Sequence, residues 1–345
     1  MRAALFNGPH NITVGERPDP AIQEPTDAIV RVVLACVCGS DLWYYRGVSP
    51  HEVGSIGHEF IGVVEEIGSG VATVSVGDLV VAPFIYSDMT CPNCLNGSTL
   101  SCPVGGNFGN GHIDGGQGEK VRVPLAGSTL VPVPGTGHSD EVMKSLLALS
   151  DVMSTGHHAA VSAGVQQGST VAVVGDGAVG LSAVLASHRL GAEKIIAMSR
   201  HPERQQLAKE FGATDIIEER GEAANERVLA LTDGWGVDSS MECVGTAESI
   251  ATAFAIAKAG STVGVVGVPH GGPPFAEVFF RNKGFRGGPA PARVYIPELM
   301  RDVLNGRINP GRVFDYETNL DGIPDGYKAM DERVAVKSLI RVGSL

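Results

Sequence analysis

Residues 170–190 read TVAVVGDGAVGLSAVLASHRL and place an apolar strand, a glycine-rich turn and a helix in direct succession. The turn has the form G-x-G-x-x-G, with Gly175, Gly177 and Gly180 at its fixed positions. Such glycines permit a tight turn, close approach of the backbone to a pyrophosphate and close helix packing, while the helix N-terminus attracts phosphate. A turn that merely happens to be rich in glycine is the alternative, but the position between strand and helix favours a dinucleotide site.

Strands and helices alternate from this turn onward. The expected strands are Thr170–Val174, Lys194–Ala197, Ser239–Cys243 and Thr262–Val268, and the expected helices are Val179–Leu190, Pro202–Phe211 and Ala247–Ala259. This alternation predicts a doubly wound parallel sheet, and therefore an α/β domain spanning residues 151–288.

The chain on either side of this domain has a different texture. Before it lie short segments rich in Val and Ile, such as Ala28–Ala35, Phe60–Ile67 and Asp78–Phe84, which fit a barrel-like β domain over residues 1–150. After residues 287–291, GGPAP, we expect a helix at Ile296–Asn305 and a strand at Ala335–Val342. This final segment, residues 289–345, is expected to complete the first domain.

Composition narrows the class of partner. The 345 residues include 43% hydrophobic and 19% charged residues, so the chain can bury a sizeable core. The 38 acidic against 26 basic residues give a formal net charge of -12, which repels nucleic acids and anionic membranes. The start MRAALF lacks the apolar core of a signal peptide, and no apolar run reaches membrane-spanning length. We therefore expect a soluble, cytoplasmic protein that acts on small molecules.

The end of the second expected strand bears on the choice of nicotinamide cofactor. A site that prefers NAD usually has Asp or Glu there to bind the ribose hydroxyls, whereas this chain has Met198-Ser199-Arg200. The Ser199 hydroxyl and the Arg200 guanidinium can bind a 2'-phosphate, with possible help from Arg204, so NADP is favoured and NAD stays open. The alternative is that Arg200 is an ordinary solvated charge at a strand end.

Three of the six cysteines fall within twelve residues. Asp88, Cys91, Cys94 and Cys102 form the pattern D-x2-C-x2-C-x7-C, and such clustering in a cytosolic chain favours a metal over disulfides. Three thiolates and one carboxylate complete the closed tetrahedral shell of a structural zinc. Asp88 has a competing interpretation as a simple turn residue, and Cys36 and Cys243 are expected to be core residues.

Three further segments extend the pattern beyond this lobe. They are Cys38-Gly39-Ser40-Asp41, Gly57-His58-Glu59, and residues 151–156, DVMSTG. Together with the cysteine lobe and the G-x-G-x-x-G turn, their order resembles the zinc-dependent medium-chain dehydrogenases over essentially the whole chain. The match is best with the branch of secondary-alcohol and formaldehyde-type dehydrogenases that use Asp as the third zinc ligand. The resemblance implies a chaperonin-10-like β-barrel catalytic domain and a Rossmann nucleotide-binding domain.

The resemblance also implies roles for individual residues. Cys38, His58 and Asp151 would bind a catalytic zinc and leave one position open for substrate. Glu59 would be an exchangeable ligand or an outer neighbour, Asp41 would orient the imidazole of His58, and Ser40 would take the substrate proton. Other implied positions are Thr155 and Val179 against the nicotinamide, and Trp43, Phe84 and Phe108 around the substrate.

Two departures from the family pattern affect this transfer of roles. Trp43 stands where many relatives have a proton-relaying His, and an indole does not titrate. The proton must therefore leave otherwise, for instance from Ser40 through the cofactor ribose, or with His51 as a stand-in. Asp88 replaces the fourth cysteine of the lobe, which bears on how tightly that zinc is held.

We therefore expect a zinc-dependent alcohol dehydrogenase with two Zn²⁺ per chain and NADP, or NAD, as its cofactor. By resemblance it would be a homodimer or homotetramer. Three alternatives stay open: an inactive NADP-binding protein with structural zinc only, a polyol or formaldehyde-type dehydrogenase using NAD, and a zinc-free quinone or enone reductase. The last class lacks both the ligand set and the cysteine lobe.

Overall fold

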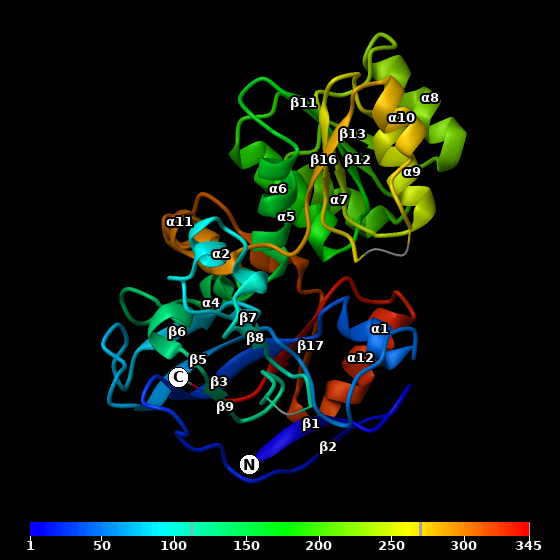
Figure 1. Ribbon diagram of the computed structural model, residues 1–345. Helices are drawn as coiled ribbons and strands as arrows, with labels where there is room; N and C mark the ends of the chain where they lie inside the picture. Colours follow the sequence, from blue (N-terminus) through cyan, green and yellow to red (C-terminus); the bar gives the residue numbers. More distant parts are fainter. Residues whose placement is uncertain (112, 269–270, 345) are drawn as a thin grey trace. The chain divides into compact units, whose positions relative to one another are not determined.

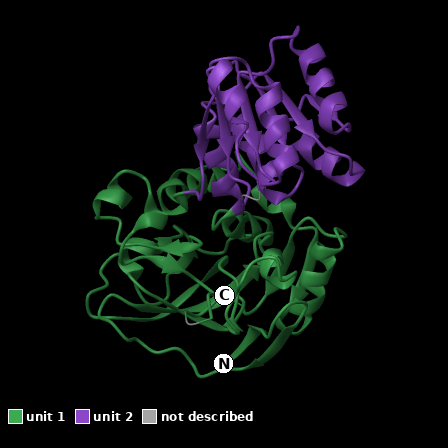
Figure 2. Ribbon diagram, turned by 45° about the vertical axis from the view of Figure 1, so that its right-hand side comes forward, with its two compact units in different colours: residues 1–151, 291–345 green, residues 152–290 purple. Residues whose placement is uncertain are grey.

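The computed structural model describes residues 1–111, 113–268 and 271–344. It divides into two compact units, which Figure 2 shows in different colours. Unit 1 consists of Met1–Asp151 and Pro291–Leu345, and unit 2 consists of Val152–Ala290. Each unit has its own cluster of buried apolar side chains.

Unit 2 is built on a six-stranded sheet in which all neighbouring strands are parallel, in the order β13-β12-β11-β14-β15-β16. The strands are β11 (Thr170–Val174), β12 (Lys194–Met198), β13 (Asp215–Ile217), β14 (Ser239–Glu242), β15 (Thr262–Val265) and β16 (Gly284–Gly287). The strand order reverses at β11, and in such sheets ligands bind beyond the carboxyl ends of the strands at the reversal. The predicted α/β class and doubly wound sheet are confirmed.

Helices cover both faces of this sheet. They are α5 (Val152–Ser162), α6 (Ala178–Arg189), α7 (Pro202–Glu210), α8 (Gly221–Leu231), α9 (Ala247–Ile256) and α10 (Phe275–Phe280). Helix α5 packs against α6 and α8 packs against α9, and Figure 1 shows the two pairs on opposite sides of the sheet. Because both faces are covered, the β11 residues Val171–Val174 are all buried, which explains their unbroken apolar run.

Unit 1 is organised around β3 (Ala28–Cys36). On one side β3 pairs with β5 (Phe60–Ile67), and on the other with β9 (Lys120–Val123) and then β18 (Ser338–Arg341), all antiparallel. The remaining strands are β1 (Arg2–Phe6), β2 (Ile12–Glu16), β4 (Gly54–Ser55), β6 (Leu79–Ala82), β7 (Ile85–Tyr86), β8 (Gly106–Asn107), β10 (Val131–Pro132) and β17 (Tyr316–Asn319). The C-terminal segment of the chain thus contributes β18 to the sheet that β3 and β5 form in unit 1.

The helices of unit 1 are short, apart from α4 and those of the C-terminal segment. They are α1 (Asp41–Tyr45), α2 (Pro92–Leu95), α3 (Ala126–Thr129), α4 (Asp140–Ala148), α11 (Ala292–Leu304) and α12 (Ile323–Asp331), with 3₁₀ turns at Thr99–Ser101, Pro310–Val313 and Leu320–Gly322. In neither unit does a helix of the described chain have the length and apolar character needed to cross a membrane.

Several predicted boundaries are wrong by a few residues, and helix α5 is absent from the sequence-based prediction. Strand β15 ends at Val265 instead of Val268, because the N–H groups of Val266 and Gly267 donate to the Glu242 carbonyl. Helix α9 ends at Ile256 because Ala257 takes an extended backbone. Most of α5 is buried, so its sequence carries no polar stripe by which an amphipathic helix is recognised.

Candidate metal centres and cofactor site

Four side chains from distant segments of unit 1 converge on one point. They are Cys38 and His58, which follow β3 and precede β5, Glu59, and Asp151 at the end of the unit's first segment; one donor atom from each lies within 4.8 Å of the others. The Asp151 Oδ2 atom lies 3.3 Å from both Cys38 Sγ and His58 Nε2. Ligand atoms about 2 Å from a tetrahedrally coordinated zinc lie about 3.3 Å apart, so both distances from Asp151 fit such a site.

The pKa values of Cys38 and His58 indicate that this group of side chains favours a bound positive charge. Burial and the charge of Asp151 raise the pKa of the Cys38 thiol to about 11. Burial disfavours the imidazolium form of His58, but Asp41 and Cys38 outweigh it and hold the pKa of His58 well above its usual value. A divalent cation would displace the protons held by the thiol and the imidazole.

Asp41 lies directly behind His58 and is fully engaged. Its Oδ1 lies 3.4 Å from His58 Nδ1, which leaves Nε2 directed toward Asp151, and its Oδ2 accepts hydrogen bonds from Cys38 N at 3.0 Å and Gln117 Nε2 at 3.3 Å. Gln117 in turn accepts a hydrogen bond from the Tyr327 hydroxyl at 3.0 Å. Outer contacts of this kind orient a metal-binding imidazole.

Glu59 is held by a lysine that the sequence analysis did not single out. Lys337 Nζ donates to Glu59 Oε1 at 2.7 Å and to the Val37 carbonyl at 3.1 Å. Burial raises the pKa of the Glu59 carboxyl, whereas the adjacent Lys337 ammonium lowers it.

The other residues proposed near the substrate lie in varied settings. Ser40 is the half-buried N-cap residue of α1, Trp43 lies within that helix, and the Phe84 ring centroid lies 6.2 Å from that of His58. Phe108 is buried in the core of unit 1, where its ring packs edge-on against Phe60 and Tyr86.

His51, the proposed stand-in for a proton-relaying histidine, has partners at both of its ring nitrogens. Its two ring nitrogens lie at hydrogen-bond distance from the carbonyls of Glu52 and Gly109, and its ring packs against Phe6 and Tyr44.

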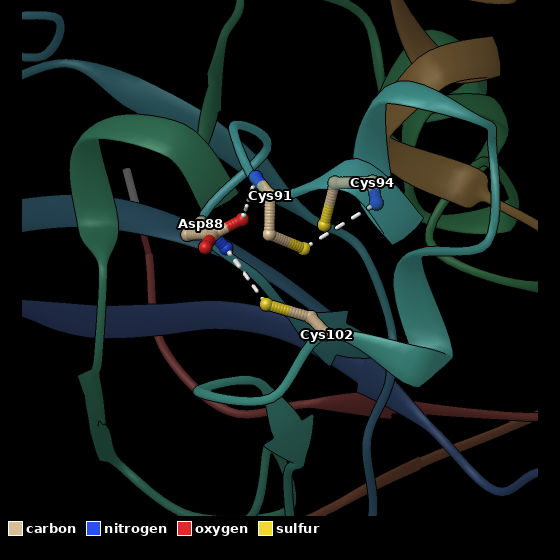
Figure 3. A group of neighbouring side chains, drawn as sticks. All are labelled: Asp88, Cys91, Cys94 and Cys102. Atoms are coloured by element: carbon tan, nitrogen blue, oxygen red, sulfur yellow. Dashed lines mark hydrogen bonds between the residues drawn. The ribbon is translucent and has the colours of Figure 1, made fainter.

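The cysteine lobe forms the second group. Figure 3 shows the side chains of Asp88, Cys91, Cys94 and Cys102 directed toward one another, and one donor atom from each lies within 4.8 Å of the others. Asp88 Oδ1 also accepts the N–H groups of Thr90 and Cys91, and these bonds hold the pKa of its carboxyl well below the usual value. Asp88 therefore fits both interpretations of the sequence. It stabilises a turn through its hydrogen bonds, and its ionised carboxylate also lies among the three cysteines.

In unit 2, the turn from Gly175 to Gly180 joins β11 to α6. A Cβ atom added at Gly180 would lie 2.0 Å from the Gly175 carbonyl oxygen, so the turn closes only with glycine there. A Cβ at Gly177 would meet nothing within 4 Å, and no side chain caps the helix that begins after it. The helix N-terminus is therefore open to a phosphate, as a dinucleotide requires.

A cluster of arginines surrounds the end of β12. Arg200 is exposed, and Arg204 pairs with Asp176 at 3.3 Å, while the Ser199 hydroxyl donates to the same carboxylate at 2.8 Å. Arg220, which the sequence analysis did not identify, precedes α8; burial and the positive charge of Arg200 lower its pKa. A bound anion would relieve the mutual repulsion between Arg200 and Arg220. Arg204 neutralises Asp176, the acidic residue of the Gly175–Gly180 turn.

Thr155 belongs to α5 and Val179 to α6, and these two helices pack against each other. Thr155 is 8% exposed and Val179 is half-buried.

Comparison with known proteins gives two family matches. Residues 24–135 match the model "Alcohol dehydrogenase GroES-like domain", and residues 178–301 match "Zinc-binding dehydrogenase". The chain is 33% identical to "Zinc-type alcohol dehydrogenase B" of Aspergillus flavus over 353 residues, covering 99% of this chain and 82% of that protein.

Solved structures agree over the full length. Alcohol dehydrogenase TADH from Thermus sp. ATN1 superposes with a TM-score of 0.91 at 36% identity, covering 99% of this chain and 100% of that one. A structure described as a zinc-binding dehydrogenase from Sinorhizobium meliloti 1021, bound to NADP, superposes with a TM-score of 0.82 at 27% identity, covering 99% and 98%.

Proposed function

Because this chain belongs to the zinc-dependent medium-chain dehydrogenase family and is an oxidoreductase of the zinc alcohol dehydrogenase type, we propose that it oxidises an alcohol with NADP and catalyses the reverse reduction. The observation that carries this proposal is the convergence of Cys38, His58 and Asp151, with their donor atoms spaced as three ligands of a tetrahedral metal. Three protein ligands leave a fourth position for a substrate. In this proposal unit 1 is the catalytic domain and unit 2 is the nucleotide-binding domain.

Different residues of unit 1 would bind the metal, orient a metal ligand and receive the proton of the substrate hydroxyl. Cys38, His58 and Asp151 would hold Zn²⁺, which supplies a Lewis acid that lowers the pKa of an alcohol. Asp41 keeps His58 Nε2 directed at the metal position. Ser40, two residues after Cys38, would accept a hydrogen bond from the substrate hydroxyl and would release its own proton toward solvent as it takes the substrate proton. Phe84, beside His58, offers an apolar wall, which favours a small or partly apolar alcohol.

The residues of unit 2 bind and orient the nicotinamide cofactor, which supplies the hydride acceptor. The open N-terminus of α6 at Gly177 would bind the pyrophosphate, and Thr155 and Val179 would hold the nicotinamide ring in one orientation. Arg200 and Arg220 would bind the 2'-phosphate. A relative bound to NADP supports the same choice of cofactor.

Metal analysis combined with a cofactor assay tests this function. The purified protein should contain two zinc ions per chain and should reduce NADP faster than NAD when offered a panel of alcohols. One zinc per chain and no reduction with any alcohol, aldehyde or ketone would instead support a binding protein with structural zinc only.

Replacing Arg200 by alanine should weaken NADP binding by roughly 10- to 100-fold and leave NAD binding nearly unchanged. The reason is the loss of a charge-assisted hydrogen bond to the 2'-phosphate, worth about 1.5–3 kcal/mol. Fluorescence titration with each cofactor measures both constants, and Lys209→Ala on the exposed face of α7 is the matched control. Equal weakening of both cofactors in the Arg200→Ala protein would show that Arg200 does not read the phosphate.

We also propose that the protein forms a homodimer through the edge strand β16 of unit 2. Phe275, Phe279 and Phe280 of the adjacent helix α10 are 71–81% exposed, and Phe285 in β16 is 52% exposed. An exposed edge strand beside a cluster of exposed phenylalanines tends to pair with another copy. Phe285→Lys should convert the dimer to a monomer, which light scattering measures. The control is Trp235→Lys, at an exposed residue in the turn after α8, which should remain a dimer. A Phe285→Lys protein that is still a dimer would contradict this interface.

A further inference from the structure

Gln117 is a buried residue of unit 1 whose side-chain amide joins two other segments of the chain. It is 1% exposed. Its Nε2 atom donates to the Cys36 carbonyl at 3.1 Å and to Asp41 Oδ2 at 3.3 Å, and its Oε1 atom accepts the Tyr327 hydroxyl at 3.0 Å. Both polar atoms of the amide are therefore hydrogen-bonded, and the two hydrogens on Nε2 each have an acceptor.

The chemistry of these partners allows the amide only one orientation. A backbone carbonyl and a carboxylate accept hydrogen bonds, so a reversed amide would place its oxygen against two acceptors. Burial raises the pKa of Tyr327 well above its usual value, so its hydroxyl keeps the proton that it donates to Oε1. Tyr327 is itself 0% exposed and packs against the ring of Tyr45. The amide of Gln117 is thus held from both ends.

Glycines bring the segment that carries Gln117 against the residues that precede His58. The Gly116 N–H donates to the Gly57 carbonyl at 3.0 Å. A Cβ atom added at Gly57, whose φ is +88°, would lie 2.5 Å from Gln117 Cγ, and one added at Gly115 would lie 2.1 Å from the Ile56 carbonyl oxygen. Only residues without a side chain fit at these contacts, so Gln117 lies directly against the residue before His58.

Through Asp41, the amide of Gln117 acts on two proposed metal ligands at once. Asp41 Oδ2, which Gln117 holds, also accepts the Cys38 N–H at 3.0 Å, and Asp41 Oδ1 lies 3.4 Å from His58 Nδ1. A shift of this carboxylate would therefore move the Cys38 backbone and the His58 ring together. Donors that are already held in place avoid the entropy cost of ordering them when the metal binds.

We propose that Gln117, held by Tyr327, is a positioning residue that fixes the separation and direction of the Cys38 and His58 donors before the metal binds. This inference rests on the metal centre of the proposed function. The lobe is independent of Gln117, because its four donors lie within residues 88–102 and hold one another through that segment. The lobe therefore provides an internal reference in the same unit.

Competition with a graded chelator tests the proposal on the purified full-length protein without relying on turnover. It yields two zinc-binding constants, which the Cys38→Ala and Cys94→Ser proteins assign to their sites. Gln117→Leu keeps the volume and removes the hydrogen bonds. It should weaken the Cys38-dependent site by at least about tenfold, the usual cost of losing an outer contact, and leave the lobe constant nearly unchanged.

Cobalt gives a second readout that a general loss of stability would not change. After Co²⁺ replaces the zinc, the visible bands that Cys38→Ala removes should shift in Gln117→Leu, because the His58 ring takes a different direction. Thr129→Val is the control, since it removes another buried hydrogen bond of unit 1, from Thr129 Oγ1 to the Pro124 carbonyl. It should leave the Cys38-dependent constant and bands as in the wild type.

Tyr327→Phe decides whether the tyrosine acts through Gln117. It removes one hydroxyl and should weaken the Cys38-dependent site alone, by about threefold or more. In the Gln117→Leu protein the same change should weaken that site no further, so additive losses would overturn the proposal.

The proposal is also overturned if Gln117→Leu leaves the Cys38-dependent constant unchanged or weakens both sites equally. If Gln117→Leu fails to fold, Tyr327→Phe is still decisive, because an unchanged constant in that protein overturns the proposal. Absence of zinc binding that depends on Cys38 in the wild-type protein would refute the metal centre itself.

Discussion

Replacing Cys38 by alanine should abolish alcohol-dependent reduction of the cofactor and lower the zinc content from two ions per chain to one. The thiol is one of three proposed ligands whose donor atoms meet in unit 1, and the two that are left would not hold a metal with an open position. The loss in kcat/KM should be at least about a thousandfold, equivalent to about 4 kcal/mol of transition-state stabilisation. Metal analysis and steady-state assays measure the two effects.

Cys36 provides the matched control for this experiment. It is buried, lies two residues before Cys38 and does not belong to the group of four donors. Cys36→Ala should keep two zinc ions and measurable activity. NADP binding, which depends on unit 2, should survive in both variants, so undiminished turnover of Cys38→Ala would refute the mechanism and not merely its details.

Replacing Cys94 by serine should remove the other zinc and destabilise unit 1. The apolar lobe side chains Leu95, Leu100 and Val104 are 47–75% exposed. The side chains of Cys91, Cys94 and Cys102 converge there with Asp88. A structural metal contributes several kcal/mol to folding, so the apparent Tm should fall by about 10 °C or more. Differential scanning calorimetry together with zinc analysis measures the effect.

The rate at which a chelator removes zinc from the lobe should depend on the pH and on the residue at position 88. Without metal, burial raises the pKa of the Cys94 thiol to about 12, so metal binding must release its proton and must weaken as the pH falls. A chelator should therefore extract the lobe zinc faster at pH 6 than at pH 8. Asp88→Cys should slow this extraction and Asp88→Asn should accelerate it; equal rates in Asp88→Asn and wild type would show that Asp88 acts only as a turn residue.

The sequence predicted the features that local pattern encodes. The strand, turn and helix around Gly175–Gly180 lie where expected, because their apolar runs and glycines have physical roles within a few residues of one another. The grouping of Asp88 with the three lobe cysteines was equally readable, since four potential metal donors lie within fifteen residues. The segments around Cys38, His58 and Asp151 needed a family resemblance, because each is unremarkable by itself.

The supporting residues could not be read in this way. Lys337 and Glu59 are 278 residues apart, and Gln117 and Tyr327 are 210 apart, so only the pairing of strands brings them together. The sequence alone does not distinguish a buried lysine from a lysine on the surface. The one local signal was that Lys337 interrupts an apolar run inside the predicted strand Ala335–Val342, and Arg220 offered no comparable signal.

The pairing of β18 with β3 also has a consequence for protein synthesis. The ribosome makes β18 only after it has made all of unit 2, whose residues are contiguous and can fold as they emerge. Until then the Leu34–Cys36 edge of β3 lacks its partner strand, and Glu59 lacks its cation. A nascent chain therefore passes through an interval in which an unpaired strand edge of unit 1 is exposed to chaperones and to aggregation. The protection of that edge and the pairing of Glu59 with Lys337 occur in the same late step of translation.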